Sequence, residues 1–161
     1  MGVAASGKST IASKLSKATG WRYFEGDDYH PKANVRKMSE GTPLTNKDRV
    51  AWIDAMAGAV REDKTDIVIL SCSALNEFVR QRLSKGCARK VDWVYLKVSR
   101  EELTQRMQAR EKHFMKESML ESQLSAMEPP KVCLEVDASQ SVQKTLNQIE
   151  KGLTFSSQGS N

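Results

Sequence analysis

Four short apolar runs alternate with longer amphipathic segments along the chain. The runs that predict strands cover residues 21–24, 67–70, 91–98 and 132–136. The run at 67–70, Ile-Val-Ile-Leu, is uninterrupted, as expected of a strand covered on both faces. Segments with helical spacing lie at residues 10–18, 48–62, 76–85, 100–111, 116–127 and 142–152. This alternation predicts βαβ units and therefore an α/β fold, a parallel sheet flanked by helices.

The length of 161 residues fits one domain, expected over residues 1–152. Residues 153–161 are rich in Ser, Gly and Gln, which predicts a disordered tail. No apolar stretch of about 18 residues is present, so no membrane span is expected. Three cysteines without C-x-x-C spacing, and no signal-peptide pattern, favour free thiols in a cytoplasmic protein.

The net charge of +5 is modest. Its basic residues are scattered along the predicted helices and are not interleaved with aromatic residues, so we do not expect a nucleic acid as a partner. A small anionic substrate, or a nucleotide, accounts for positive charge in a cleft equally well.

A complete phosphate-binding loop of the Walker A type opens the chain. Its pattern is Gly, four residues and then Gly-Lys-Ser, directly before a predicted helix. Backbone N–H groups of such a loop face phosphate oxygens, Lys8 reaches the β- and γ-phosphates, and the Ser9 hydroxyl is a Mg²⁺ ligand. A nucleoside triphosphate and Mg²⁺ are therefore the expected ligands. The residues expected to bind the nucleotide are Gly2, Val3, Ala4, Ala5, Ser6, Gly7, Lys8, Ser9 and Thr10.

A buried strand normally leads into this loop, but only Met1 precedes Gly2. We therefore expect the first, central strand of the sheet to be missing. Three explanations remain open: a truncated sequence, a weakly stable form, or another segment that fills the gap.

A second polar cluster, Glu25 to Pro31, follows the predicted strand at 21–24. Ligand sites of parallel sheets lie at the carboxyl ends of strands, so these acids are expected to face the phosphate loop. Asp27 is our candidate for the base that accepts a hydroxyl proton, and for holding Mg²⁺ through water. The alternative is a solvated acidic turn that caps the next helix, which suits Asp28 better.

These motifs, together with several others, resemble the P-loop gluconokinase family over residues 1–149. The further matching segments are Asn34, Lys37-Met38, Gly41-Thr42-Pro43-Leu44, Asp48-Arg49, Trp52, Cys72-Ser73-Ala74-Leu75, Arg110, His113-Phe114-Met115 and Glu128-Pro129-Pro130. The resemblance implies a P-loop kinase fold with a helical lid near residues 111–130, similar to shikimate and adenylate kinases. It implies ATP-dependent phosphorylation of D-gluconate to 6-phosphogluconate, which feeds the pentose phosphate pathway. Family members are often dimers, so a homodimer is one option.

Under this resemblance, Arg49 and Arg80 are expected to clamp the gluconate carboxylate, because a planar guanidinium binds carboxylates bidentately. Asp27 and His30 are expected to contact sugar hydroxyls, although a structural role for His30 in the Pro31 turn is equally open. His113 is expected in the lid, beside the substrate.

Arg106 and Arg110 share one helix face and are expected to reach the phosphates of ATP. A solvated basic face is the alternative. Together with Lys8 and Asp27, Arg110 completes the predicted catalytic set.

The chain departs from the family pattern where two lysines and a tyrosine are typical and Asn76, Glu77 and Val79 stand instead. Glu77 is unfavourable beside an anionic substrate if its side chain points inward. A related sugar-acid or polyol kinase is therefore one alternative function. A nucleotide-binding form impaired in catalysis, in line with the expected missing strand, is the other.

Overall fold

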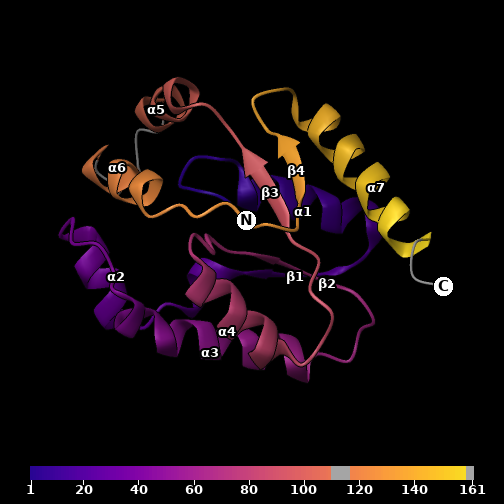
Figure 1. Ribbon diagram of the computed structural model, residues 1–161, viewed down its shortest axis with the longest axis horizontal. Helices are drawn as coiled ribbons and strands as arrows, with labels where there is room; N and C mark the ends of the chain where they lie inside the picture. The colour runs from indigo at the N-terminus through magenta and orange to yellow at the C-terminus, as the bar shows by residue number, and fades with distance from the viewer. Residues whose placement is uncertain (110–116, 159–161) are drawn as a thin grey trace.

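The computed structural model describes residues 1–109 and 117–158, in which helices and parallel strands alternate (Figure 1). In chain order the elements are α1 (Lys8–Thr19), β1 (Arg22–Glu25), the short 3-10 helix η1 (Gly26–Tyr29), α2 (Lys32–Ser39), α3 (Asn46–Glu62), β2 (Val68–Ser71), α4 (Glu77–Cys87), β3 (Val94–Lys97), α5 (Arg100–Gln108), α6 (Glu117–Ser125), β4 (Leu134–Asp137) and α7 (Val142–Gln158). Each predicted strand and helix has a counterpart here. No helix among the described residues combines the length and the apolar character needed to cross a membrane.

The strands form two parallel pairs, β1 with β2 and β3 with β4. Tyr23 is paired with Ile69 in the first sheet, and Leu96 with Val136 in the second. The α/β fold with parallel strands flanked by helices is thus confirmed. The single continuous sheet is not, because the described strands form two separate sheets.

Met1 and Gly2 lie between the two pairs of strands. The Met1 nitrogen donates to the Val94 carbonyl oxygen at 2.6 Å, and the Leu96 N–H donates to the Met1 carbonyl oxygen at 3.0 Å. The Gly2 N–H donates to the carbonyl oxygen of Ser73, just beyond β2, at 3.3 Å. These two residues therefore supply backbone partners on both sides, as a central strand would. The missing strand remains a prediction.

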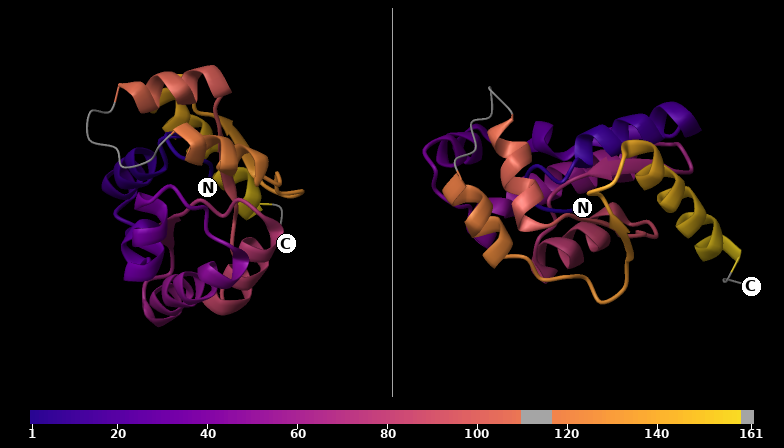
Figure 2. Two further views of the ribbon diagram at one scale, coloured as in Figure 1. Left: turned by 90° about the vertical axis from the view of Figure 1, so that its left-hand side faces the viewer. Right: turned by 90° about the horizontal axis from the view of Figure 1, so that it is seen from above.

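Helices cover both sides of the strands (Figure 2). On one side, Trp52, Ile53 and Met56 of α3 pack with Val79 and Leu83 of α4 in a buried cluster. On the other, α1 and α7 form a second cluster with the inner side chains of β3 and β4. The carboxyl ends of β1 and β2 lie beside the phosphate loop, because Glu25 is hydrogen-bonded to Ser9 and the Gly2 N–H donates to the Ser73 carbonyl oxygen.

Two parts of the secondary structure differ from the predictions. Helix α2 was not predicted, because its sequence Lys-Ala-Asn-Val-Arg-Lys-Met-Ser is mostly polar. Its buried Asn34 donates through Nδ2 to the Asp48 carbonyl oxygen at 2.9 Å, so a polar contact holds it on α3.

A disordered tail was predicted at residues 153–161, but α7 continues to Gln158, so the prediction is wrong for residues 153–158. Leu153 continues the apolar stripe of Leu146 and Ile149 and packs on the same cluster, which explains the longer helix. Residues 159–161 lie outside the described part.

Candidate active site

The phosphate loop runs from Gly2 to Gly7 and delivers the chain to the first turn of α1. Gly7 is the N-cap of α1 with a φ of 93°, in the left-handed region that glycine adopts without strain. No side chain caps this helix and its first turn holds no acidic residue. The first N–H groups of α1 are thus left for an anion, and the positive end of the helix favours one. These features fit the phosphates of ATP.

Lys8 begins α1 and turns back over the loop. Its Nζ donates to the Val3 carbonyl oxygen at 2.8 Å. The ammonium group therefore lies directly over the loop backbone, where Walker lysines contact the terminal phosphates of a nucleotide. Ser9, the predicted Mg²⁺ ligand, is exposed at the same end of α1.

Glu25, at the end of β1, is the centre of a hydrogen-bond cluster that sequence reasoning missed. Its carboxylate accepts from Ser71 Oγ at 2.6 Å and from the Tyr23 hydroxyl at 2.5 Å. Partial burial favours the protonated form, but hydrogen bonds from Ser71, Ser9 and Tyr23 outweigh it and lower the pKa of Glu25. Glu25 is therefore a carboxylate in contact with the predicted Mg²⁺ ligand. The sequence signal that could have identified Glu25 is its position at the end of a predicted strand, two residues before Asp27.

Asp27 lies one residue beyond Gly26, which packs against β2. A Cβ added to Gly26 would lie 2.4 Å from the Ser71 carbonyl oxygen, so only glycine allows this approach. The indole Nε1 of Trp52 donates to the Gly26 carbonyl oxygen at 2.7 Å, which ties the turn to α3. The Asp27 carboxylate itself is exposed. It thus projects from a rigid turn, near Glu25 and the start of α1.

The chain also matches known proteins. Residues 1–128 match the AAA domain family AAA_18. A gluconokinase of Gluconobacter oxydans is 42% identical over 132 residues, which cover 81% of this chain and 74% of that protein. The thermosensitive gluconokinase of Escherichia coli is 37% identical, with 81% and 70% covered. The crystal structure of a gluconokinase from Sinorhizobium meliloti superimposes with a TM-score of 0.89 at 35% identity, over 99% of this chain and 91% of that one.

The chain belongs to the gluconokinase family. The resemblance found in the sequence is thereby confirmed, together with the P-loop kinase fold that it implied.

Arg49, which is predicted to bind the substrate of this gluconokinase-family protein, lies in the first turns of α3. Its Nη1 donates to Asn46 Oδ1 at 3.1 Å, and Asn76 Nδ2 donates to the same oxygen at 3.0 Å. Burial lowers the pKa of Arg49, although Asp48 acts in the opposite sense. Asn76 therefore does more than replace a lysine of the family, because it links α4 to the residue that holds Arg49.

Asp48, which precedes Arg49, caps the N-terminus of α3. It forms a capping box with Thr45 and an ion pair with Lys37 at 2.6 Å. The hydrogen bond from Lys37, with those from Thr45, holds the pKa of Asp48 well below its usual range. These contacts fix the start of α3 and hence the position of Arg49.

Arg80, on the first turns of α4, contacts the loop that follows β2. Its guanidinium is buried, with the residue only 4% exposed, and Nη1 donates to the carbonyl oxygens of Ala74 and Leu75 at 3.0 and 3.2 Å. Its Nη2 pairs with Glu77 at 3.0 Å. Arg80 thus holds the loop after β2, where Ala74 has a left-handed φ of 45°, and its predicted role in substrate binding stays a prediction.

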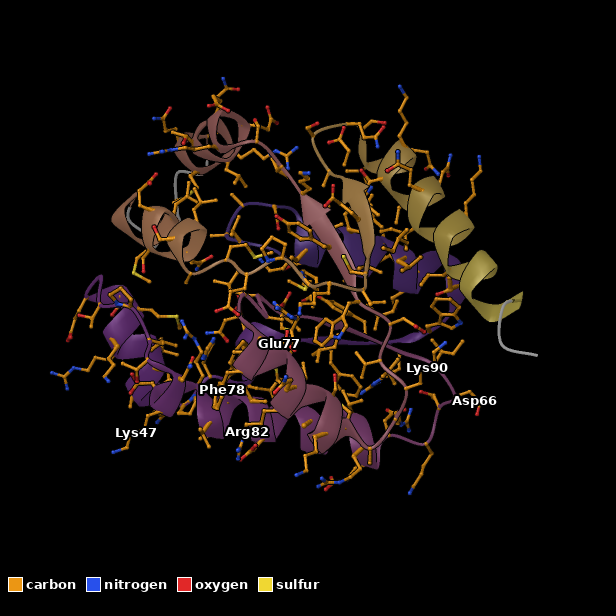
Figure 3. The ribbon with its side chains drawn as sticks, in the orientation of Figure 1. Lys47, Asp66, Glu77, Phe78, Arg82 and Lys90 are labelled. Atoms are coloured by element: carbon orange, nitrogen blue, oxygen red, sulfur yellow. The ribbon has the colours of Figure 1, made fainter. Side chains whose placement is uncertain are left out.

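The two other departures from the family pattern also have structural explanations. Glu77 lies at the start of α4 (Figure 3), where its carboxylate accepts from Arg80 and from Gln81 Nε2. Its charge is thereby compensated. Val79 is buried in the cluster between α3 and α4, so it does not line a pocket.

The side chain of His30 stacks on Trp52, with ring centroids 4.5 Å apart. Its Nδ1 is buried and has no hydrogen-bond partner within the described part of the chain. The ring therefore packs on Trp52, whereas its predicted roles in the Pro31 turn and at a sugar hydroxyl both stay predictions.

Arg106 of α5 contacts the loop that follows β4. Its Nη2 donates to the Ala138 carbonyl oxygen at 2.7 Å, and Nε pairs with Glu102 at 2.8 Å. Arg106 is thus held beside that loop, and its contact with phosphates stays a prediction. Arg110 and His113 lie outside the described residues, as does the first part of the predicted lid.

Proposed function

We propose that this chain transfers the γ-phosphoryl group of ATP to D-gluconate and forms 6-phospho-D-gluconate. The observation that carries the proposal is the hydrogen bond between Ser9, just after the phosphate loop, and Glu25, at the start of the turn that contains Asp27. Phosphoryl transfer requires a fixed phosphate donor and a positioned acceptor hydroxyl, and these two segments can supply them. Membership of the gluconokinase family then indicates D-gluconate as the acceptor.

On the donor side, the loop N–H groups and Lys8 would bind and orient the phosphates. The Ser9 hydroxyl would be the direct ligand of Mg²⁺, and Glu25 and Asp27 would act through bound water. Mg²⁺ usually keeps several waters and needs few protein ligands. The described residues fit this pattern, because the exposed Ser9 hydroxyl at the start of α1 is hydrogen-bonded to Glu25.

On the acceptor side, Asp27 would accept the proton of the attacking hydroxyl. Arg49 would bind the carboxylate of gluconate, since its guanidinium is directed by Asn46, which Asn76 holds in turn. His30 would contact a hydroxyl of the sugar acid, and Arg106, Arg110 and His113 would complete the site from the lid side.

Steady-state turnover with ATP and Mg²⁺ tests this proposal against a panel of acceptors. The panel contains D-gluconate, other aldonic acids, and a six-carbon polyol without a carboxylate. We expect gluconate to give the highest kcat/KM, and the polyol to lose most of it because Arg49 has no carboxylate to bind. Turnover of the polyol equal to that of gluconate would contradict the assigned substrate.

Two further properties belong to the same proposal. The cysteines Cys72, Cys87 and Cys133 are free thiols, which suits the reducing cytoplasm where ATP is available. A homodimer would agree with the resemblance, because members of the family are often dimers. Sedimentation of the purified chain in an analytical ultracentrifuge would measure its oligomeric state.

A further inference from the structure

A hydrogen bond joins helix α6 to the phosphate loop. The Ala4 N–H donates to the side-chain oxygen Oε1 of Gln123 at 2.7 Å. The two residues are 119 positions apart in the chain. A backbone group of the phosphate loop is therefore oriented by a side chain from the lid side of the molecule.

The part of the loop next to this bond has a demanding conformation. Ala5 has a φ of 61°, in the left-handed region that residues with a Cβ atom rarely adopt. Such a conformation persists only when its surroundings enforce it. The bond from Gln123 fixes the peptide plane between Val3 and Ala4, so it restricts the loop at the residue that precedes Ala5.

Helix α6 is itself firmly held. Leu120 is fully buried, in a cluster that includes Val3, Ala5 and Leu103. Gln123 lies three positions further on, so both side chains are on one face of the helix.

The segment after α6 is also fixed in place. Glu128 accepts from the Glu77 N–H at 2.8 Å, and its own N–H donates to the Leu75 carbonyl oxygen at 2.8 Å. Because Leu120 within α6 and Glu128 after it are both held, the amide of Gln123 reaches Ala4 from a fixed support. In Figure 1 and in both views of Figure 2, α6 lies beside α5 at one end of the molecule.

We propose that Gln123 is a positioning residue for phosphoryl transfer, which acts by orienting the Ala4 amide and thereby the phosphate loop. The inference rests on the proposed function, because loop orientation affects the rate only if the chain transfers a phosphoryl group. Small displacements of positioning groups change reaction rates strongly. Gln123 does not need to touch the reacting atoms for this effect.

The substitution Gln123→Met tests the inference, because methionine keeps the length of the side chain and removes the acceptor oxygen. We expect amide hydrogen exchange at Ala4, measured by NMR without nucleotide, to accelerate at least about tenfold, since the protecting bond is lost. We expect kcat to fall about tenfold, as for the loss of one backbone hydrogen bond. The KM for gluconate should stay within about twofold, because the acceptor residues are unchanged.

Gln148→Met is the matched control, because Gln148 is exposed on α7. It should leave Ala4 exchange and turnover unchanged. Gln123→Met with wild-type exchange at Ala4 and wild-type turnover would overturn the inference. Absence of turnover in the wild type would instead overturn the proposed function and the inference together, so the two failures are distinguishable.

A second variant keeps the test decisive if Gln123→Met does not fold. Gln123→Glu retains an acceptor oxygen for Ala4, and its carboxylate titrates. We expect the Ala4 amide resonance of this variant to shift with pH near the ordinary glutamate pKa of about 4.3. An Ala4 resonance that does not respond to this titration would overturn the inference.

Discussion

The imidazole ring of His30 lies parallel to the indole of Trp52, with centroids 4.5 Å apart and an interplanar angle of 8°. Trp52 also donates to the Gly26 carbonyl oxygen. One side chain of α3 therefore holds both ends of the turn that presents Asp27. Burial lowers the pKa of His30, and Arg49 lowers it further while Asp27 opposes the shift. The stacked ring is therefore neutral at pH 7.

The neutral state of His30 predicts a pH-dependent stability. The unfolded chain binds a proton at His30 below about pH 6.5, whereas the folded chain resists it, so this contribution to stability is present above pH 6.5 and lost as pH falls. His30→Phe keeps a ring against Trp52 but does not titrate. Between pH 7.5 and 5.5 we expect the wild type to lose up to about 1 kcal/mol of unfolding free energy relative to His30→Phe. Urea unfolding at both pH values measures this difference, and an unchanged difference would contradict the neutral His30.

Asp27→Asn should lower kcat by roughly 10²-fold or more, because the variant cannot accept the hydroxyl proton. The affinity for ATP, measured by isothermal titration, should change little, since the phosphate loop is intact. Asp28→Asn is the matched control, with the same chemical change at the next, exposed residue, and should retain turnover. Full activity of Asp27→Asn would remove Asp27 from the catalytic set.

Lys8→Ala should reduce kcat by roughly 10²-fold or more, because the positive charge that stabilises the transferring phosphate is lost. Lys14→Ala removes an exposed lysine from the same helix and should leave kcat within about twofold of the wild type. Rapid-quench measurement of product formation compares the two variants. Equal effects of the two substitutions would contradict the role of Lys8.

The two arginines expected to clamp the substrate should respond differently to substitution by lysine. Arg49→Lys loses the bidentate fork and should raise the KM for gluconate roughly tenfold, with little change in thermal stability. Arg80→Lys should destabilise the fold by about 1–3 kcal/mol, because buried carbonyl oxygens of Ala74 and Leu75 lose a partner. Gluconate titrations and thermal unfolding of both variants separate these roles. A raised KM for gluconate in Arg80→Lys, with an unchanged KM in Arg49→Lys, would instead favour Arg80 as the residue that binds the carboxylate.

The elements of the fold were largely predictable because their signals are local. The aliphatic run before Ser71 predicts β2, and the Gly7-Lys8-Ser9 sequence before an amphipathic segment predicts the start of α1. Helix α2 and the end of α7 were missed, because tertiary contacts of Asn34 and Leu153 decide them.

The site was only partly predictable, because side-chain direction depends on packing across the chain. The motif around Arg80 resembles a substrate-binding segment, yet its guanidinium is directed to its own loop. Glu25 was passed over in favour of Asp27, because its contacts with Ser71 and Ser9 come from distant segments. The bond between Gln123 and Ala4 has no local signal either.

The most direct test of the account is ³¹P NMR of a reaction mixture that contains the wild-type chain, ATP, Mg²⁺ and D-gluconate. We predict that the γ-phosphate resonance of ATP is replaced by ADP and by the phosphomonoester resonance of 6-phosphogluconate, and that the Lys8→Ala variant leaves ATP intact over the same period. A folded wild-type protein that forms no phosphomonoester from gluconate would contradict the account.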